Sequence, residues 1–242
     1  MTRLRQIGAF LRVDLIVFVR FWHVSLFMVG MTTFYFLMLT RFAPVSMQSD
    51  VTLVFIILAV LSVALLHFGQ RVSLERSEQW SPFVRTLPVP TWAKLAARLL
   101  LVLMVGALAA VLIMVAGAVR FGVVYDLRSV VTGIIAVPLA AAVFAPISAC
   151  IGGWASPNGI SPLTTTAFLT VTWSSGVWTA GRLPGSLAPV EFLLPVQAIQ
   201  GAASAAASAQ WAQALPDFAV AVVWALPAYL LALRLNTVSE AV

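Results

Sequence analysis

The stretch QRVSLERSEQWSPFVRTLPVPTWAKLAAR, from Gln70 to Arg98, is the long polar break in a chain that is otherwise mostly apolar. The whole chain has 14 Lys or Arg and 8 Asp or Glu residues. Seven of these 22 charged side chains fall in this stretch, namely Arg71, Glu75, Arg76, Glu78, Arg85, Lys94 and Arg98. A membrane protein that gathers its charge in one internal loop exposes that loop to water, where it can bind a partner.

The composition is that of an integral membrane protein. Of the 242 residues, 62% are hydrophobic and 9% are charged, whereas soluble domains have about 45–50% apolar and about 25% charged residues. We therefore expect residues 1–242 to form a single all-α transmembrane domain. The net charge of +6 is explained by Arg on cytoplasmic loops. Nucleic-acid binding is not expected, because no basic cluster stands beside exposed aromatic residues.

Histidine and cysteine are too scarce to predict a metal site or a catalytic centre. The chain has two His and one Cys, and a metal site needs several converging ligands. We interpret His67 as an interfacial or packed side chain and Cys150 as a small packed one. No catalytic residue and no metal ligand is predicted.

The first 20 residues are predicted to form an amphipathic helix in the membrane interface. Their charges exclude a secretory signal peptide, which needs an uninterrupted apolar centre. On a helical wheel one side carries Leu4, Ile7, Leu11, Leu15 and Phe18, and the other carries Arg5, Arg12 and Arg20. Such a helix places its Arg side chains among lipid headgroups. The alternative is a cytoplasmic extension of the first span.

Uncharged runs of about 20 residues predict six membrane-spanning helices, because that length crosses a ~30 Å hydrocarbon core. The expected spans are about 21–41, 51–70, 92–119, 129–151, 162–181 and 215–235. The fourth and fifth come from one long uncharged run, which the turn-forming residues 152–162 divide.

Two segments between spans have unusual sequences. Residues 71–91 are predicted to hold two polar helix ends and a short helix, Pro82 to Leu87, which Pro88 and Pro90 terminate. Residues 182–214 are rich in Pro and then in Ala, so they are expected to form short re-entrant helices that dip into one membrane face without crossing it.

The basic residues predict the orientation. With six spans, one side carries ten Lys or Arg residues, in the first 20 residues, in 71–98 and at Arg234, and the other side carries four. The positive-inside rule puts the first side in the cytoplasm. Both termini and the 71–91 loop are then cytoplasmic, and 182–214 is extracellular.

Several short motifs resemble a known family. Leu74-Glu75-Arg76-Ser77-Glu78-Gln79-Trp80, followed by Leu87-Pro88-Val89-Pro90 and Lys94-Leu95, is similar to the first cytoplasmic loop of ABC-2-type ABC transporter permeases. A second set is similar to the segment around the fifth and sixth helices of that family: Ser175-Gly176-Val177-Trp178, Leu183-Pro184-Gly185 and Leu194-Pro195-Val196-Gln197.

This resemblance implies the permease subunit of a bacterial ABC exporter in the plasma (inner) membrane. The chain has no G-x-x-x-x-G-K-[ST] phosphate-binding loop, so it would bind no cofactor itself. ATP and Mg would be bound by separate ATPase subunits, and a second permease subunit, the same or homologous, would complete the transporter. The implied ATPase-coupling residues are Glu75, Arg76, Glu78, Trp80, Phe83 and Arg85, and the implied extracellular gate is Pro184, Gly185, Pro195 and Gln197.

The exported substrate would be an amphipathic drug, antibiotic or lipid-like molecule, with Trp173, Ser175 and Trp178 as possible residues of its path. These aromatic residues can also serve as packing or interface anchors. The alternative function is an ATP-independent secondary transporter or channel, although secondary transporters carry ionisable residues inside their spans and none of the eight acids lies deep in an expected span.

Overall fold

The fold was analysed in a computed structural model that describes residues 3–20, 22–42, 44, 47–77, 91–176 and 188–241. Every regular element in these ranges is a helix. In chain order they are α1 (Arg3–Arg20), α2 (Trp22–Thr40), α3 (Gln48–Ser62), the π-helical η2 (Val63–Gly69), α4 (Gln70–Ser77), α6 (Thr91–Phe121), α7 (Leu127–Trp154), α8 (Ile160–Ser174), the 3₁₀ helix η4 (Ala188–Leu193), α9 (Pro195–Ala207) and α10 (Trp211–Ala241).

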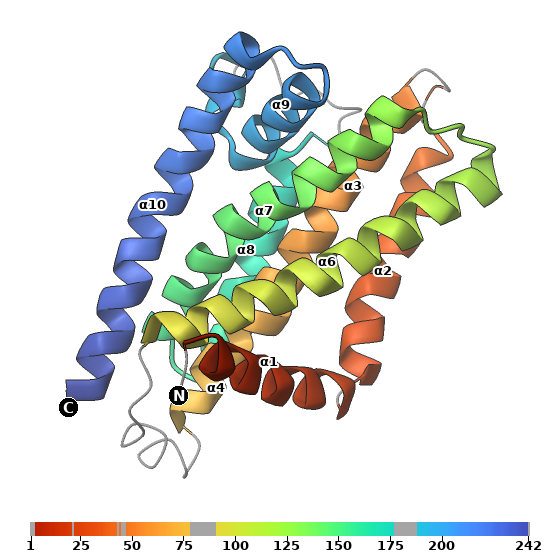
Figure 1. The fold of residues 1–242 in the computed structure, drawn as a ribbon. Coiled ribbons are helices and arrows are strands. Elements are labelled where there is room, and N and C mark those ends of the chain that lie inside the picture. The colour runs from red at the N-terminus through yellow and green to blue at the C-terminus, as the bar shows by residue number, and fades with distance from the viewer. Residues whose placement is uncertain are drawn as a thin grey trace.

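The helices run up and down in one bundle, and both ends of the chain lie at the same end of it (Figure 1). Helix α1 lies across this end and packs on α6 (Figure 1). The end of α4 and the start of α6 also lie there. We call this the terminal end of the bundle. The end of α2, the start of α3, the α6–α7 link and helix α9 lie at the opposite end (Figure 1).

Four helices are long and apolar enough to cross a membrane, so the expectation of a helical membrane protein is confirmed. They are Gln48–Ser77, which joins α3, η2 and α4, then Trp92–Phe121, Leu127–Trp154 and Trp211–Leu235. At about 1.5 Å per residue, their 25 to 30 residues exceed the ~30 Å core. The described apolar stretch of α2 is Val29–Thr40, and α8 has 15 residues. The six-span count therefore stays a prediction.

The helix from Gln48 to Ser77 is the centre of the bundle, and α10 is on its edge. Among the 18 most apolar consecutive residues of each helix, 83% are buried in Gln48–Ser77 and 11% in Trp211–Leu235. Helix α10 accordingly exposes Val222, Val223, Leu226 and Leu230. An apolar surface of this extent suits contact with lipid rather than water.

A close crossing joins the π-helical segment to α7. The Ser148 hydroxyl of α7 donates to the Ala64 carbonyl of η2, so it satisfies a backbone group at a point where the α-helical pattern is interrupted. One helical turn further along α7, a Cβ added to Gly152 would lie 2.8 Å from the Val72 Cβ and would also clash with the Gly69 carbonyl oxygen. Only a glycine lets the two backbones approach this closely.

Helix α9 is too short to cross a membrane. Its 13 residues measure about 20 Å, and they pack against α7 and α10 at the end opposite the termini (Figure 1). Its packed face consists of Val196, Ile199, Ala202, Ala203 and Ala206. How deep this helix lies in a bilayer, and so its re-entrant character, stays a prediction.

Candidate functional site

The coupling residues expected from the sequence fall partly within the structure. Glu75 and Arg76 lie in the last turns of α4. Glu78, Trp80, Phe83 and Arg85 lie outside the described residues. Of the other expected residues, Pro184, Gly185 and Trp178 also lie outside them, while Pro195, Gln197, Trp173 and Ser175 are described.

Glu75 joins α4 and α6, the two helices on either side of residues 78–90. Its carboxylate accepts a hydrogen bond from Arg71 Nε, one turn earlier on α4, at 3.0 Å. Its other oxygen pairs with the guanidinium of Arg98 on α6. The Arg98 side chain is 13% exposed and that of Glu75 is 24% exposed. An ion pair this poorly solvated is screened less than a surface pair, so it fixes α4 against α6.

Arg98 is also held by an aromatic ring. Its guanidinium carbon lies 5.5 Å from the centre of the Phe68 ring, which belongs to η2. This distance is within the range of a cation–π interaction. Arg98 therefore connects α6 both to the π-helical segment and to α4.

Asp14 of α1 lies beside Arg71 and Arg98. It lines a cavity of about 20 Å³ together with His67, Arg71 and Arg98. Burial raises the pKa of Asp14 to about 6, against the opposing effect of Arg98. Phe18, one helical turn further on, meets the His67 ring edge-on, with 5.3 Å between ring centres. Helix α1 thus covers the charge cluster.

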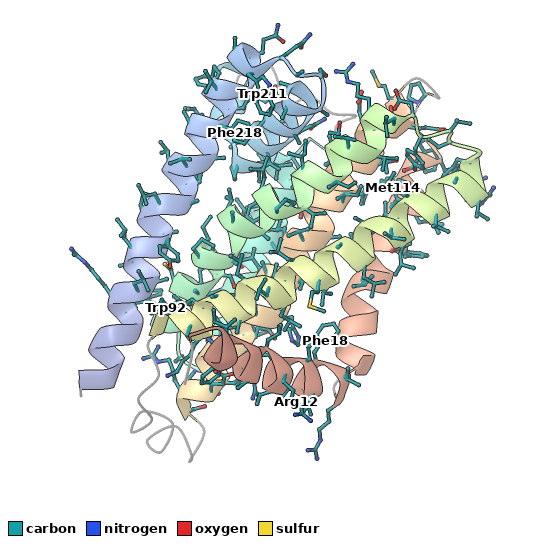
Figure 2. All side chains as sticks on the ribbon, viewed as in Figure 1. Arg12, Phe18, Trp92, Met114, Trp211 and Phe218 are labelled. Atoms are coloured by element: carbon teal, nitrogen blue, oxygen red, sulfur yellow. The ribbon has the colours of Figure 1, made fainter. Side chains whose placement is uncertain are left out.

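The sequence reasoning did not identify Asp14 as part of any site. A signal for it was present, because Asp14 is three residues after Leu11, next to Leu15 and four residues before Phe18, so it lies on the side of the helix that carries these three residues. These three side chains pack against the core, whereas Arg12 and Arg20 are exposed, as expected (Figure 2). An acid on the packed face of an amphipathic helix needs a polar partner inside the protein.

Arg76 and Ser73 connect α4 to the end of α7. The Arg76 guanidinium donates to the Gly153 carbonyl, and the Ser73 hydroxyl donates to the Ala155 carbonyl at 2.9 Å. The last carbonyls of a helix have no partner within it, so these two side chains cap α7. We call Asp14, Arg71, Glu75, Arg76 and Arg98 the basal charge cluster.

Two residues expected in different sites are brought together at the far end of α8. The Gln197 side-chain nitrogen donates to the Ser175 carbonyl over 3.4 Å, which joins α9 to the end of α8. Ser175 is 1% exposed, and its hydroxyl donates to the Thr172 carbonyl. Ser175 is therefore a packed residue, whereas Trp173 is 47% exposed.

The exposed face of α8 is polar as well as aromatic. Besides Trp173, it presents Thr165, Thr166 and Thr170, and the Thr170 hydroxyl donates to the Thr166 carbonyl at 2.9 Å. A Thr bonded to its own helix leaves little unsatisfied polarity, so this face can meet either a polar ligand or an apolar one.

Among the described residues no three His, Cys, Asp or Glu side chains are grouped so that they could hold a metal ion. Comparison of the chain with protein-family models, with curated proteins and with solved structures gives no match in any of the three.

Proposed function

We propose that this chain is the permease subunit of an ATP-binding cassette exporter, in which a separate ATPase pair acts on the 71–91 loop. The observation that carries the proposal is the basal charge cluster. Both helices that leave the loop are tied to the bundle beside it, α4 to α6 through Glu75 and Arg98, and α4 to α7 through Arg76. A displacement of the loop would then move three long helices together.

In this proposal the described coupling residues do not touch the ATPase. Glu75 and Arg76 bind within the chain, so their role is to transmit movement from the loop. Contact with the ATPase then falls to Glu78, Trp80, Phe83 and Arg85. The motifs around residues 74–95, which resemble the first cytoplasmic loop of ABC-2-type permeases, support an ATPase-coupling role for this segment as a whole.

In the proposed topology the chain has six spans, with α2 in the first and α8 in the fifth, about 162–181. The terminal end of the bundle faces the cytoplasm and α9 is re-entrant from outside. Single cysteines at Ser77 and Ser186 test this topology: the first should react with a charged maleimide only from the cytoplasm, and the second only from outside. Reaction of both from one side would contradict it.

Transport would need two permease subunits, because a single bundle presents only one wall of a path. The exposed face of α8 with Trp173 is the proposed wall, and the substrate would be an amphipathic drug, antibiotic or lipid-like molecule. The native mass of the complex, purified with its ATPase partner, should correspond to two permeases and two ATPases. One permease for each ATPase pair would refute the assembly.

The loop is tested by Trp80→Ala and Phe83→Ala. Arg41→Ala is the control, because Arg41 follows the end of α2 that lies away from the terminal end of the bundle. A buried aromatic anchor contributes about 2 kcal/mol or more to an interface. Each loop variant should therefore lose co-purifying ATPase and transport, while inserting as well as the parent. If both loop variants bind the ATPase and transport as the Arg41→Ala control does, the loop is not the coupling element.

One observation favours a second candidate, an ATP-independent secondary transporter. Asp14 lies in a cavity with two arginines and has a raised pKa, and such a carboxyl can bind and release a proton near neutral pH. Uptake of a substrate into proteoliposomes driven by a pH gradient, with no ATPase present, would support this function over the exporter.

A further inference from the structure

A second polar region lies at the end of the bundle opposite the basal charge cluster. It is a cavity of about 310 Å³, which is within the size range of small-molecule sites. Its walls come from the start of α3, the α6–α7 link, the start of α7, and Ser204 of α9. Met114 of α6, which lines it, is labelled near this end in Figure 2.

Hydrogen bonds fix the mouth of this cavity. The hydroxyls of Tyr125 and Thr52 are 3.1 Å apart, which ties the α6–α7 link to α3. The Asp126 carboxylate accepts from the Ser129 backbone N–H at 2.8 Å and from the Ser129 hydroxyl at 2.6 Å. These bonds hold the pKa of Asp126 below its usual range, so its carboxylate is ionised at neutral pH. The site is therefore formed before any ligand arrives.

The lining is polar at one side and apolar at the other. Its charged groups are Asp50, Asp126 and Arg128, an excess of one negative charge. Asp50 and Asp126 are exposed, whereas Leu53 is 8% exposed and Ile56 is 2% exposed. Together with Met114, these two buried residues make an apolar inner wall.

This pattern matches a molecule with a positive head and an apolar tail. We propose that the cavity binds the ammonium group of an amphiphile between Asp50 and Asp126, with the tail against Leu53, Ile56 and Met114. An anionic head would meet two carboxylates and one guanidinium, and a fully polar ligand would leave the inner wall uncovered. Arg128 can donate hydrogen bonds to the phosphate of a zwitterionic lipid. The ammonium group that the cavity would bind can therefore belong either to a phosphatidylethanolamine headgroup or to a free alkylammonium ion.

The inference does not depend on an ATPase or on transport, so it is tested by binding alone. The chain is placed in micelles of an uncharged maltoside detergent, which has neither an ammonium group nor a net charge, and is titrated calorimetrically with octylammonium, octanol and octyl sulfate, with protein-free micelles as the blank. Octylammonium should bind at least about tenfold more tightly than octanol, since one charge-assisted contact contributes about that factor. Octyl sulfate should bind more weakly than octylammonium.

Two variants and one control locate the site. Asp50→Asn should weaken octylammonium binding about tenfold. Asp126→Asn should also weaken it, while asparagine still caps α7. Glu191→Gln, an acid of η4 that does not line the cavity, should bind as the parent does. Equal binding of octylammonium and octanol, tighter binding of octyl sulfate, or equal losses in Asp50→Asn and Glu191→Gln would each overturn the proposal.

A final titration separates the two sources of the ammonium group. If short-chain phosphatidylethanolamine competes with octylammonium in the parent and not in Arg128→Gln, the natural ligand is a lipid that also uses its phosphate. If octylammonium binds without such competition, the ligand is a free organic cation. Both results support an ammonium site, and binding of neither probe would refute it.

Discussion

Replacement of Glu75 and Arg98 by glutamine, singly and together, measures the strength of the ion pair that joins α4 to α6. Two unit charges about 4 Å apart attract by about 4 kcal/mol at an effective dielectric constant of 20. Desolvation reduces the net value, and exposed pairs retain about 0.2–1 kcal/mol. Because the Arg98 side chain is 13% exposed and Glu75 is 24% exposed, this pair lies between the exposed and the buried case.

We expect Arg98→Gln to destabilise the folded state by about 2 kcal/mol, since it removes one of the two arginine partners of the partly buried Glu75 carboxylate. Glu75→Gln should cost a similar amount, because it leaves Arg71 and Arg98 facing each other. The double variant should cost less than the sum of the two, with a coupling energy of about 1–2 kcal/mol.

The assay is equilibrium unfolding in mixed micelles, followed by helix content for the four proteins of the cycle. Arg120→Gln is the control, because Arg120 lies near the other end of α6 and is exposed; it should change stability by no more than about 0.5 kcal/mol. Single-variant losses that add within about 0.5 kcal/mol would show that Glu75 and Arg98 are not coupled, and the proposed route of movement would lose its first step.

Three further predictions follow from the packing and the charges. Gly152→Ala should cost about 1–3 kcal/mol in the same unfolding assay through overpacking, whereas Gly153→Ala, whose Cβ would lie an ordinary 3.5 Å from Leu235, should be nearly neutral; equal losses would refute the close crossing. Burial raises the pKa of Asp14 from 3.8 to about 6 when α1 is docked. Between about pH 4 and about pH 6 the undocked helix therefore releases the Asp14 proton while the docked helix keeps it, so docking of α1 should weaken as the pH rises through this range. Hydrogen exchange of residues 3–20, corrected for intrinsic rates, should show this change in the parent and not in Asp14→Asn. Gly201→Ala should loosen α9 from α10, because the added Cβ would lie 2.8 Å from the Asp217 carboxyl carbon; exchange of α9 should rise and should return to the parent level when Asp217→Ala is added.

Apolar run length was enough to predict the long helices. The expected spans 92–119 and 129–151 lie within α6 and α7, because both runs are bounded by charged residues that stay outside lipid. The expected span 51–70 and the polar helix end expected after it form one helix, which is described to Ser77. Its last turns carry charge and yet remain helical, since Arg71, Glu75 and Arg76 find partners inside the protein.

Those partners could not be derived from sequence spacing. The pair of Arg71 with Glu75 is four residues apart and follows from helix geometry. The pair of Glu75 with Arg98 and the contact of Arg76 with Gly153 depend on how the helices pack, and periodicity carries no information about that. The cavity that Asp50 and Asp126 line was missed for the same reason, because these residues lie far apart in the sequence and line one cavity only in the folded bundle.

The π-helical segment Val63–Gly69 makes this helix tolerant of a change in length at one place. A π-turn holds one residue more than the α-turn it replaces, so loss of one residue from 63–69 would be absorbed by a return to α-geometry, with Glu75 still facing Arg98 and Arg76 still facing α7. The same deletion after Gly69 has no such turn to absorb it and would rotate the rest of the helix by about 100°. A single in-frame codon deletion should therefore be better tolerated within residues 63–69 than within residues 70–74.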